Sequence, residues 1–185
     1  MMTTFKKLLH GLETFNTYML AAGRSVAWVL VFLMVACILA QVFFRYVLDN
    51  ALPWPEEVAR ALMIWMMGLV AASGYRWGSF VAIDLVNDVL PTLIGRILKL
   101  ILLILAMVVL AELFVLAIEF FQRGFRTRAA SFHLSRAWIY LAMPVCFGSM
   151  LMVNIELVLR EFGRLFGNPE DFPDPVKPDL TTSAE

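Results

Sequence analysis

Residues 26–44 read VAWVLVFLMVACILAQVFF, a run of 19 residues without a charged side chain, bounded by Arg24 and Arg45. A helix needs roughly 20 apolar residues to cross the hydrocarbon core of a bilayer. The run therefore predicts a transmembrane helix. A cleaved signal peptide is disfavoured, because the run ends in Gln-Val-Phe-Phe-Arg and not in a small-residue cleavage site.

Three further apolar runs follow along the chain. Arg60 and Arg76 lie at the edges of the second run and are expected to extend toward the interfaces. Pro144 falls inside the last run, which Arg136 and Glu156 bound, and a proline is tolerated in a membrane helix because neighbouring groups satisfy the freed carbonyl. The sequence thus predicts an all-α membrane domain over residues 1–165, with four transmembrane helices at about 26–44, 58–77, 97–121 and 137–155.

The composition agrees with membrane insertion. Hydrophobic residues make up 61% and charged residues 16% of the 185 residues, whereas a soluble domain has about half and about a quarter. A small domain cannot bury so many apolar side chains in its own core, so we expect membrane lipid to cover the rest. The net charge is zero, which disfavours nucleic acid as a partner.

The two ends of the chain have different predicted structures. Apolar and polar side chains alternate with helical rhythm over residues 5–20, which predicts an N-terminal amphipathic helix in the headgroup plane. A solvated extension of the first span is the alternative. Residues 166–185 combine four prolines with several acids and predict a disordered tail.

Four spans place both termini on one side of the membrane. That side would carry nine Lys and Arg residues and the other side six, so the positive-inside rule predicts cytoplasmic termini. The loop between the third and fourth spans is the exception, because its arginines fall on the outer side. We expect them to bind lipid phosphates or an acidic subunit surface, with attraction of an anionic substrate as the alternative. These arginines are Arg123, Arg126, Arg128 and Arg136.

The start of the second span concentrates charge. Glu56 and Glu57 follow Pro55 and meet the positive end of the helix dipole. Arg60 lies four residues after Glu56, a spacing at which the two side chains can pair. The pattern fits a well-formed helix start with a membrane anchor, and it also fits a charged dock for another subunit.

Glu112 is the deepest ionisable group in the predicted spans. A charge at that depth is costly and usually faces a partner or water. One acid without a second ligand makes a poor ion or proton site, so we favour a carboxyl that is protonated or hydrogen-bonded to a neighbouring helix. Glu119 lies seven residues on, and Arg123 four further, where it can pair with Glu119.

The residues of redox and metal chemistry do not form a recognisable site. Cys37 and Cys146 lie in separate apolar runs, and the sequence has no C-x-x-C motif. His10 and His133 lie outside the runs, so neither supplies a haem ligand at membrane depth. We therefore predict that the chain is not an enzyme and that it holds no metal or cofactor.

Three segments form a further pattern. One joins Phe44-Arg45-Tyr46 to Pro53-Trp54-x-Glu56-Glu57-x-Ala59-Arg60. The second holds Trp65, Tyr75-Arg76 and Val81-Ala82-Ile83-Asp84-Leu85, and the third is Trp138-Ile139-Tyr140-Leu141-Ala142-Met143-Pro144-Val145. Together, over about residues 20–160, they resemble the small membrane subunit, or Q subunit, of tripartite ATP-independent periplasmic (TRAP) transporters.

The resemblance implies a subunit of the bacterial inner membrane within a three-part system. A periplasmic substrate-binding protein captures an organic acid, and a large membrane subunit moves it inward with sodium, which binds to that large subunit. The small subunit packs beside the large one as a scaffold. The positions expected at a subunit interface or critical for the fold are Arg45, Trp54, Glu56, Glu57, Arg60, Asp84 and Tyr140.

Other membrane functions remain as alternatives. A stand-alone four-helix exporter would use Glu112, although such exporters carry their essential acid in the first span, where this chain has none. A quinone-linked redox protein would need the thiol pairs or haem ligands that the sequence lacks. A general assembly factor is the third alternative.

Overall fold

The computed structural model describes residues 2–50, 52–87, 92–126, 135–166 and 172. This part of the chain is helical, with long helices α1 (Met2–Tyr46), α2 (Trp54–Asn87), α3 (Thr92–Gly124) and α5 (Ala142–Phe166) and a short α4 (Ala137–Tyr140). Four stretches are long and apolar enough to cross a membrane, and they confirm the predicted four-span, all-α fold. They are Lys6–Tyr46, Trp54–Gly78, Ile94–Gly124 and Ala137–Leu165.

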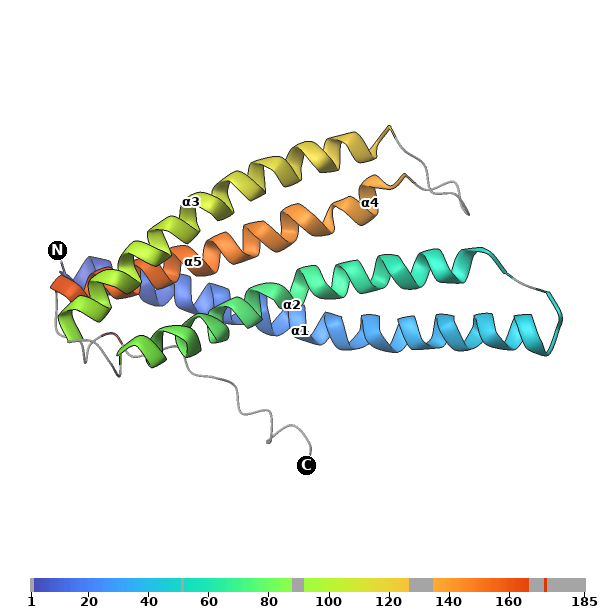
Figure 1. The fold of residues 1–185 in the computed structure, drawn as a ribbon, viewed down its shortest axis with the longest axis horizontal. Helices are drawn as coiled ribbons and strands as arrows, with labels where there is room; N and C mark the ends of the chain where they lie inside the picture. The colour runs from blue at the N-terminus through green and yellow to red at the C-terminus, as the bar shows by residue number, and fades with distance from the viewer. Residues whose placement is uncertain (1, 51, 88–91, 127–134, 167–171, 173–185) are drawn as a thin grey trace, which may run out of the picture.

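The helices form two hairpins that meet along α2 and α5. The α1–α2 and α3–α5 pairs pack closely, and α2 also packs on α5, whereas the backbones of α1 and α3 do not approach each other closely in the described part. Figure 1 shows the two hairpins diverging toward the end that carries the α1–α2 connection. The start of α1 lies at the opposite, convergent end, together with the end of α5. An even number of passes thus returns the chain to one side, as predicted, and the assignment of that side to the cytoplasm stays a prediction.

Glycines allow the helices to approach closely at two crossings. A Cβ at Gly23 of α1 would lie 3.1 Å from the carbonyl oxygen of Leu69 in α2. A Cβ at Gly68 would lie 3.0 Å from the carbonyl oxygen of Ala142 at the start of α5. Small residues at such crossings are common in membrane bundles, because helix association there depends on close packing.

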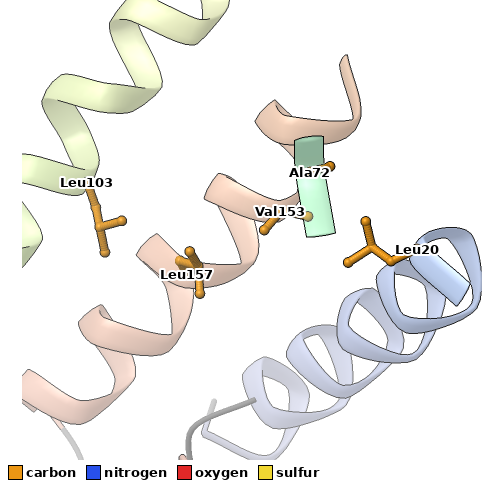
Figure 2. Close-up of a cluster of buried hydrophobic side chains, with 5 residues drawn as sticks. All are labelled: Leu20, Ala72, Leu103, Val153 and Leu157. Carbon is orange, nitrogen blue, oxygen red and sulfur yellow. The ribbon is translucent and has the colours of Figure 1, made fainter. Parts of the chain in front are cut away.

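The apolar core is small and is centred on α5. Val153 and Leu157 of α5 lie between Leu103 of α3 and Leu20 of α1, with Ala72 of α2 beside them (Figure 2). Many of the large apolar side chains on α1 and α3 are exposed. An exposed apolar surface of this extent is what a chain in lipid presents.

The predicted N-terminal amphipathic helix is not confirmed as a separate element. Its residues are the first turns of α1, which runs for 45 residues without a break. Leu9, Asn16 and Leu20 are buried, while Leu8 and Phe15 are exposed. The apolar rhythm of this segment therefore arises in part from packing against the other helices, a source that one sequence cannot distinguish from packing on a headgroup layer.

Pro144 explains why the fourth span begins as two helices. Proline lacks an N–H and its ring crowds the carbonyl four residues earlier, which here belongs to Tyr140, the last residue of α4. Leu141 between the helices keeps α-helical dihedral angles, with φ −57° and ψ −26°. The interruption is therefore local, and the span continues from α4 into α5.

The predicted tail is described at one position beyond α5. Phe172 is buried against Gly163, and its carbonyl oxygen accepts a hydrogen bond of 2.7 Å from Nε of Arg164. Residues 167–171 and 173–185 lie outside the described part, so the disorder predicted for them stays a prediction.

The packing of α3 on α4 gives a first prediction. A Cβ at Gly124 would lie 2.7 Å from Cα of Ala137, so Gly124→Ala should lower the free energy of unfolding by about 1–3 kcal/mol through overpacking. Gly74→Ala is the matched control, because a Cβ there meets nothing within 4 Å; it should be neutral or stabilising by up to about 1 kcal/mol. Unfolding midpoints in detergent check both variants. Equal midpoints would contradict the described α3–α4 contact.

Candidate functional site

A buried carboxylate joins three helices at the convergent end of the bundle. Glu156 of α5 is fully buried, and its Oε1 accepts hydrogen bonds from Nη2 of Arg76 at 2.7 Å and from Nη2 of Arg160 at 3.0 Å. Its Oε2 accepts a bond of 2.7 Å from Nδ2 of Asn16. One carboxylate thereby links α1, α2 and α5.

The two arginines reach further into α1. Nη1 of Arg76 donates to Oγ1 of Thr17 at 3.0 Å, and Nη2 of Arg160 lies 3.0 Å from Oε1 of Glu13. Hydrogen bonds that involve a charged partner are roughly twice as strong as neutral ones. The N-terminal turns of α1 are therefore fixed against α2 and α5 by charge as well as by packing.

A second buried carboxylate adds α3. Oε1 of Glu161 lies 2.6 Å from Nζ of Lys99 and 3.0 Å from Nη1 of Arg164. Lys99 belongs to α3, and both it and Glu161 are buried. The buried ionic cluster, defined here as Glu13, Asn16, Arg76, Lys99, Glu156, Arg160, Glu161 and Arg164, therefore connects all four long helices.

Neutral hydrogen bonds continue the connection beside the cluster. Nδ2 of the buried Asn154 donates to the carbonyl oxygen of Leu103 at 3.1 Å. The hydroxyl of Tyr75 donates to Oδ1 of Asn154 at 2.7 Å. Asn154 of α5 thus links α2 to α3. As in the ionic cluster, α5 supplies the residue that joins the other helices.

Sequence reasoning missed this cluster. It used Glu156 as a boundary of the fourth span, expected Arg76 to extend toward the interface, and did not single out Asn16. The available signal was local: Glu156 and Arg160 are four residues apart, and Glu161 and Arg164 are three apart. The partners on α1, α2 and α3 depend on tertiary packing, which spacing along one helix does not reveal.

Five of the predicted site residues lie near the connection between α1 and α2. Nη2 of Arg60 is 3.0 Å from Oε1 of Glu56, and both side chains are about two-thirds exposed, at 66% and 68%. The ion pair between Glu56 and Arg60 that their spacing predicted is therefore present. Arg45 is exposed with its guanidinium 5.8 Å from the ring centroid of Tyr46. Trp54 is exposed and Glu57 is half-buried.

Tyr140 and Asp84 lie away from that group. Tyr140, on α4, packs its ring on Phe120 of α3, with centroids 4.4 Å apart. Asp84 falls in the last turns of α2, toward the other end of that helix, and its side chain lies outside the described residues. The seven predicted positions thus occupy three places, and their roles in subunit contact stay predictions.

Glu112 faces away from the rest of the chain. It is exposed on α3 and makes no hydrogen bond or ion pair with any described residue. Among the described residues it therefore has no hydrogen-bond partner on a neighbouring helix, and the alternative of a protonated carboxyl stays a prediction. It also does not line the groove between α1, α2 and α5, so the exporter alternative gains no support from its position.

The arginine-rich loop is described only at its edges. Arg123 lies 3.6 Å from Glu119, and the two join Gln122 and Arg126 around a shallow hollow of about 390 Å³. Arg136 immediately precedes α4, whereas Arg128 lies outside the described residues. The function predicted for these arginines stays a prediction.

The described residues form no recognisable metal or redox site. No group of three His, Cys, Asp or Glu side chains there is placed to hold a metal ion, and Cys37 and Cys146 are free thiols. The ionic cluster can hold helices together, since the ion pairs Arg76–Glu156, Lys99–Glu161 and Arg160–Glu13 each join two different helices.

The buried cluster gives a second prediction. Glu156→Gln keeps the side-chain shape but takes the carboxylate from the buried Arg76 and one carboxylate from Arg160, which keeps its pair with Glu13, so it should lower the free energy of unfolding by about 3–5 kcal/mol. Glu56→Gln breaks an exposed pair and should cost about 1 kcal/mol or less. Thermal unfolding in detergent measures both. A loss at Glu156 no larger than that at Glu56 would show that the cluster does not hold the helices.

Comparison with known protein families identifies the family of this chain. The family model described as tripartite ATP-independent periplasmic transporters, DctQ component, matches residues 34–164, from within α1 to near the end of α5. The match includes both buried carboxylates, Glu156 and Glu161. No individual curated protein matches the chain. This is a family of transporter components and not of enzymes. The chain therefore belongs to the DctQ family and is a small permease subunit of a TRAP transporter.

Proposed function

We propose that this subunit packs on the large TRAP membrane subunit and gives it a rigid footing for sodium-coupled uptake of an organic acid delivered by a periplasmic binding protein. The observation that carries the proposal is the buried ionic cluster, in which each buried charge of the described chain pairs with an opposite charge. A bundle held in this way suits a fixed part of the transporter better than a moving part.

Rigidity follows from the cost of separating the cluster. Sliding α2 or α3 past α5 would take Arg76 or Lys99 away from its carboxylate partner on α5, and breaking a buried ion pair costs several kcal/mol. The four helices should therefore move as one body at this end. A carrier that shifts its substrate across a bilayer needs such a body to move against.

The substrate is expected to bind on the large subunit. Recognition of a carboxylate usually involves Arg, Lys or several N–H donors, yet the buried cations here already bind Glu156 and Glu161. The groove of about 330 Å³ between α1, α2 and α5 is lined mainly by apolar groups, among them Phe15, Met19 and Met152. Sodium takes oxygen ligands, and this mainly apolar groove is a poor source of them. We therefore assign sodium to the large subunit as well.

The location follows from the family and the spans. A multi-pass position in the bacterial inner membrane fits four transmembrane helices and a TRAP component. We assign the convergent end, with Lys6 and Lys7 on α1, to the cytoplasm, since the positive-inside rule favours that orientation.

A pull-down tests the assembly. The tagged chain is extracted from its native membrane in mild detergent, and its companions are identified by mass. The proposal expects a large polytopic subunit near one-to-one, and uptake by vesicles that requires both membrane subunits, the binding protein and a sodium gradient. Recovery of the chain alone, or transport by the chain alone, would remove the proposal.

The exposed arginine on α2 gives a third prediction. Arg60→Ala should lower both the recovered large subunit and the uptake, because its side chain is 66% exposed and available to a partner. Its pair with Glu56 contributes about 1 kcal/mol or less to folding, so the unfolding midpoint should barely change. Lys7→Ala, at an exposed position on the convergent end, is the control and should keep normal uptake. Normal amounts of complex with normal uptake in Arg60→Ala would rule out this contact.

A further inference from the structure

We propose that the outward face of α3, centred on Glu112, docks on a transmembrane helix of the large subunit that presents a hydrogen-bond donor at the same depth. The inference rests on the proposed function and adds the surface and the chemistry of its partner. Three features of α3 carry it, namely the two faces of the helix, the depth of Glu112 and the hydrogen-bonding chemistry of its carboxyl group.

Two opposite faces of α3 have the same spacing but different surroundings. One face packs on α5 and carries buried residues at heptad intervals, including Leu103, Leu110 and Ala117. The outward face repeats at alternating intervals of three and four residues, which is the spacing of a helix–helix seam. Its exposed residues are Ile101, Leu105, Val108, Glu112, Val115 and Glu119.

Glu112 lies within the hydrocarbon core of the membrane. It precedes Glu119 by seven residues and follows Lys99 by thirteen, so about 10 Å and about 20 Å of helix separate it from those polar positions. The hydrocarbon core is about 30 Å thick. Between residues 100 and 118 it is the one polar side chain. A glutamate is too short to reach either headgroup layer from this depth, so lipid cannot satisfy it.

The described chain offers Glu112 no partner, so a donor must come from outside it. A second copy of this chain is a poor source. Two copies in the same membrane orientation, related by a two-fold axis, would bring Glu112 against its own counterpart. Two facing carboxyl groups repel when ionised. A helix with a hydroxyl, amide or cationic side chain complements Glu112, and the large subunit supplies such a helix under the proposed function.

Photo-crosslinking in the complete transporter tests the face. Benzoylphenylalanine is placed at Val108 or Val115, one turn to either side of Glu112, and at Leu102 as the control. Leu102 is also exposed but lies about a quarter-turn round the helix. The proposal expects crosslinks to the large subunit from Val108 and Val115 at least fivefold stronger than from Leu102.

Substitution of Glu112 tests the chemistry. Glu112→Leu removes the hydrogen bond and should lower the recovered large subunit about threefold to tenfold, as expected for one polar contact between membrane helices. Glu112→Gln keeps an acceptor and should recover at least half of the loss. Since Glu112 contacts no described residue of its own chain, the unfolding midpoint of the isolated subunit should stay unchanged in both variants.

The possible outcomes distinguish a failure of the proposed docking face of α3 from a failure of the proposed function. Crosslinks that join two copies of this chain, that capture lipid alone, or that are equally strong from Leu102 would overturn the docking face while the large subunit still co-purifies. Full recovery of the large subunit with Glu112→Leu would overturn the role of the carboxyl. If the large subunit is absent from the preparation altogether, both the proposed function and this inference are wrong.

Discussion

The burial of the Glu156 carboxylate is the constraint on which the rest of this structure depends. Its two oxygens bind Asn16, Arg76 and Arg160, so the charge is stable only where α1, α2 and α5 meet in one register. Glu161 extends the same requirement to α3 through Lys99. Apolar packing in lipid specifies little about which helix neighbours which, because lipid and leucine are equally apolar. The ionic cluster supplies that specificity at one end of the bundle.

That constraint also explains the shape of the bundle. The helices converge where the cluster lies and diverge toward the other end, where the α1–α2 hairpin stands apart (Figure 1). The divergent end carries Arg45, Glu56 and Arg60 on an exposed surface, and α1 and α3 turn long apolar faces outward. A small subunit whose helices are fixed together at one end, and whose α1 and α3 expose apolar faces, is well suited to pack beside a larger membrane protein and widen it. This geometry therefore supports the proposed role of a scaffold subunit.

The sequence predicted the elements better than it predicted their contacts. The four spans follow from apolar length, the Glu56–Arg60 pair from its spacing, and a proline within the fourth span was recognised, although the break after Tyr140 was not expected. The cluster was missed, since Asn16, Arg76 and Lys99 gain their partners only when helices distant in the sequence pack together. The separate N-terminal helix was not confirmed, for a related reason: Leu9 and Leu20 have the rhythm of an amphipathic surface, yet they are buried in the bundle. Glu112 was recognised as exceptional, but its outward direction required the structure.

The rigidity of the convergent end is tested most directly by the distance there between α1 and α3, measured inside the working transporter. Spin labels at Lys7 and Ile94, both on exposed parts of their helices, report that distance by pulsed electron resonance once Cys37 and Cys146 have been replaced. If the ionic cluster holds the helices rigidly, the distance distribution is narrow and is the same with and without sodium and substrate. A distribution that broadens or shifts when sodium and substrate are added would contradict this rigidity, because the helices joined by Glu156 and Glu161 would then move against one another during transport.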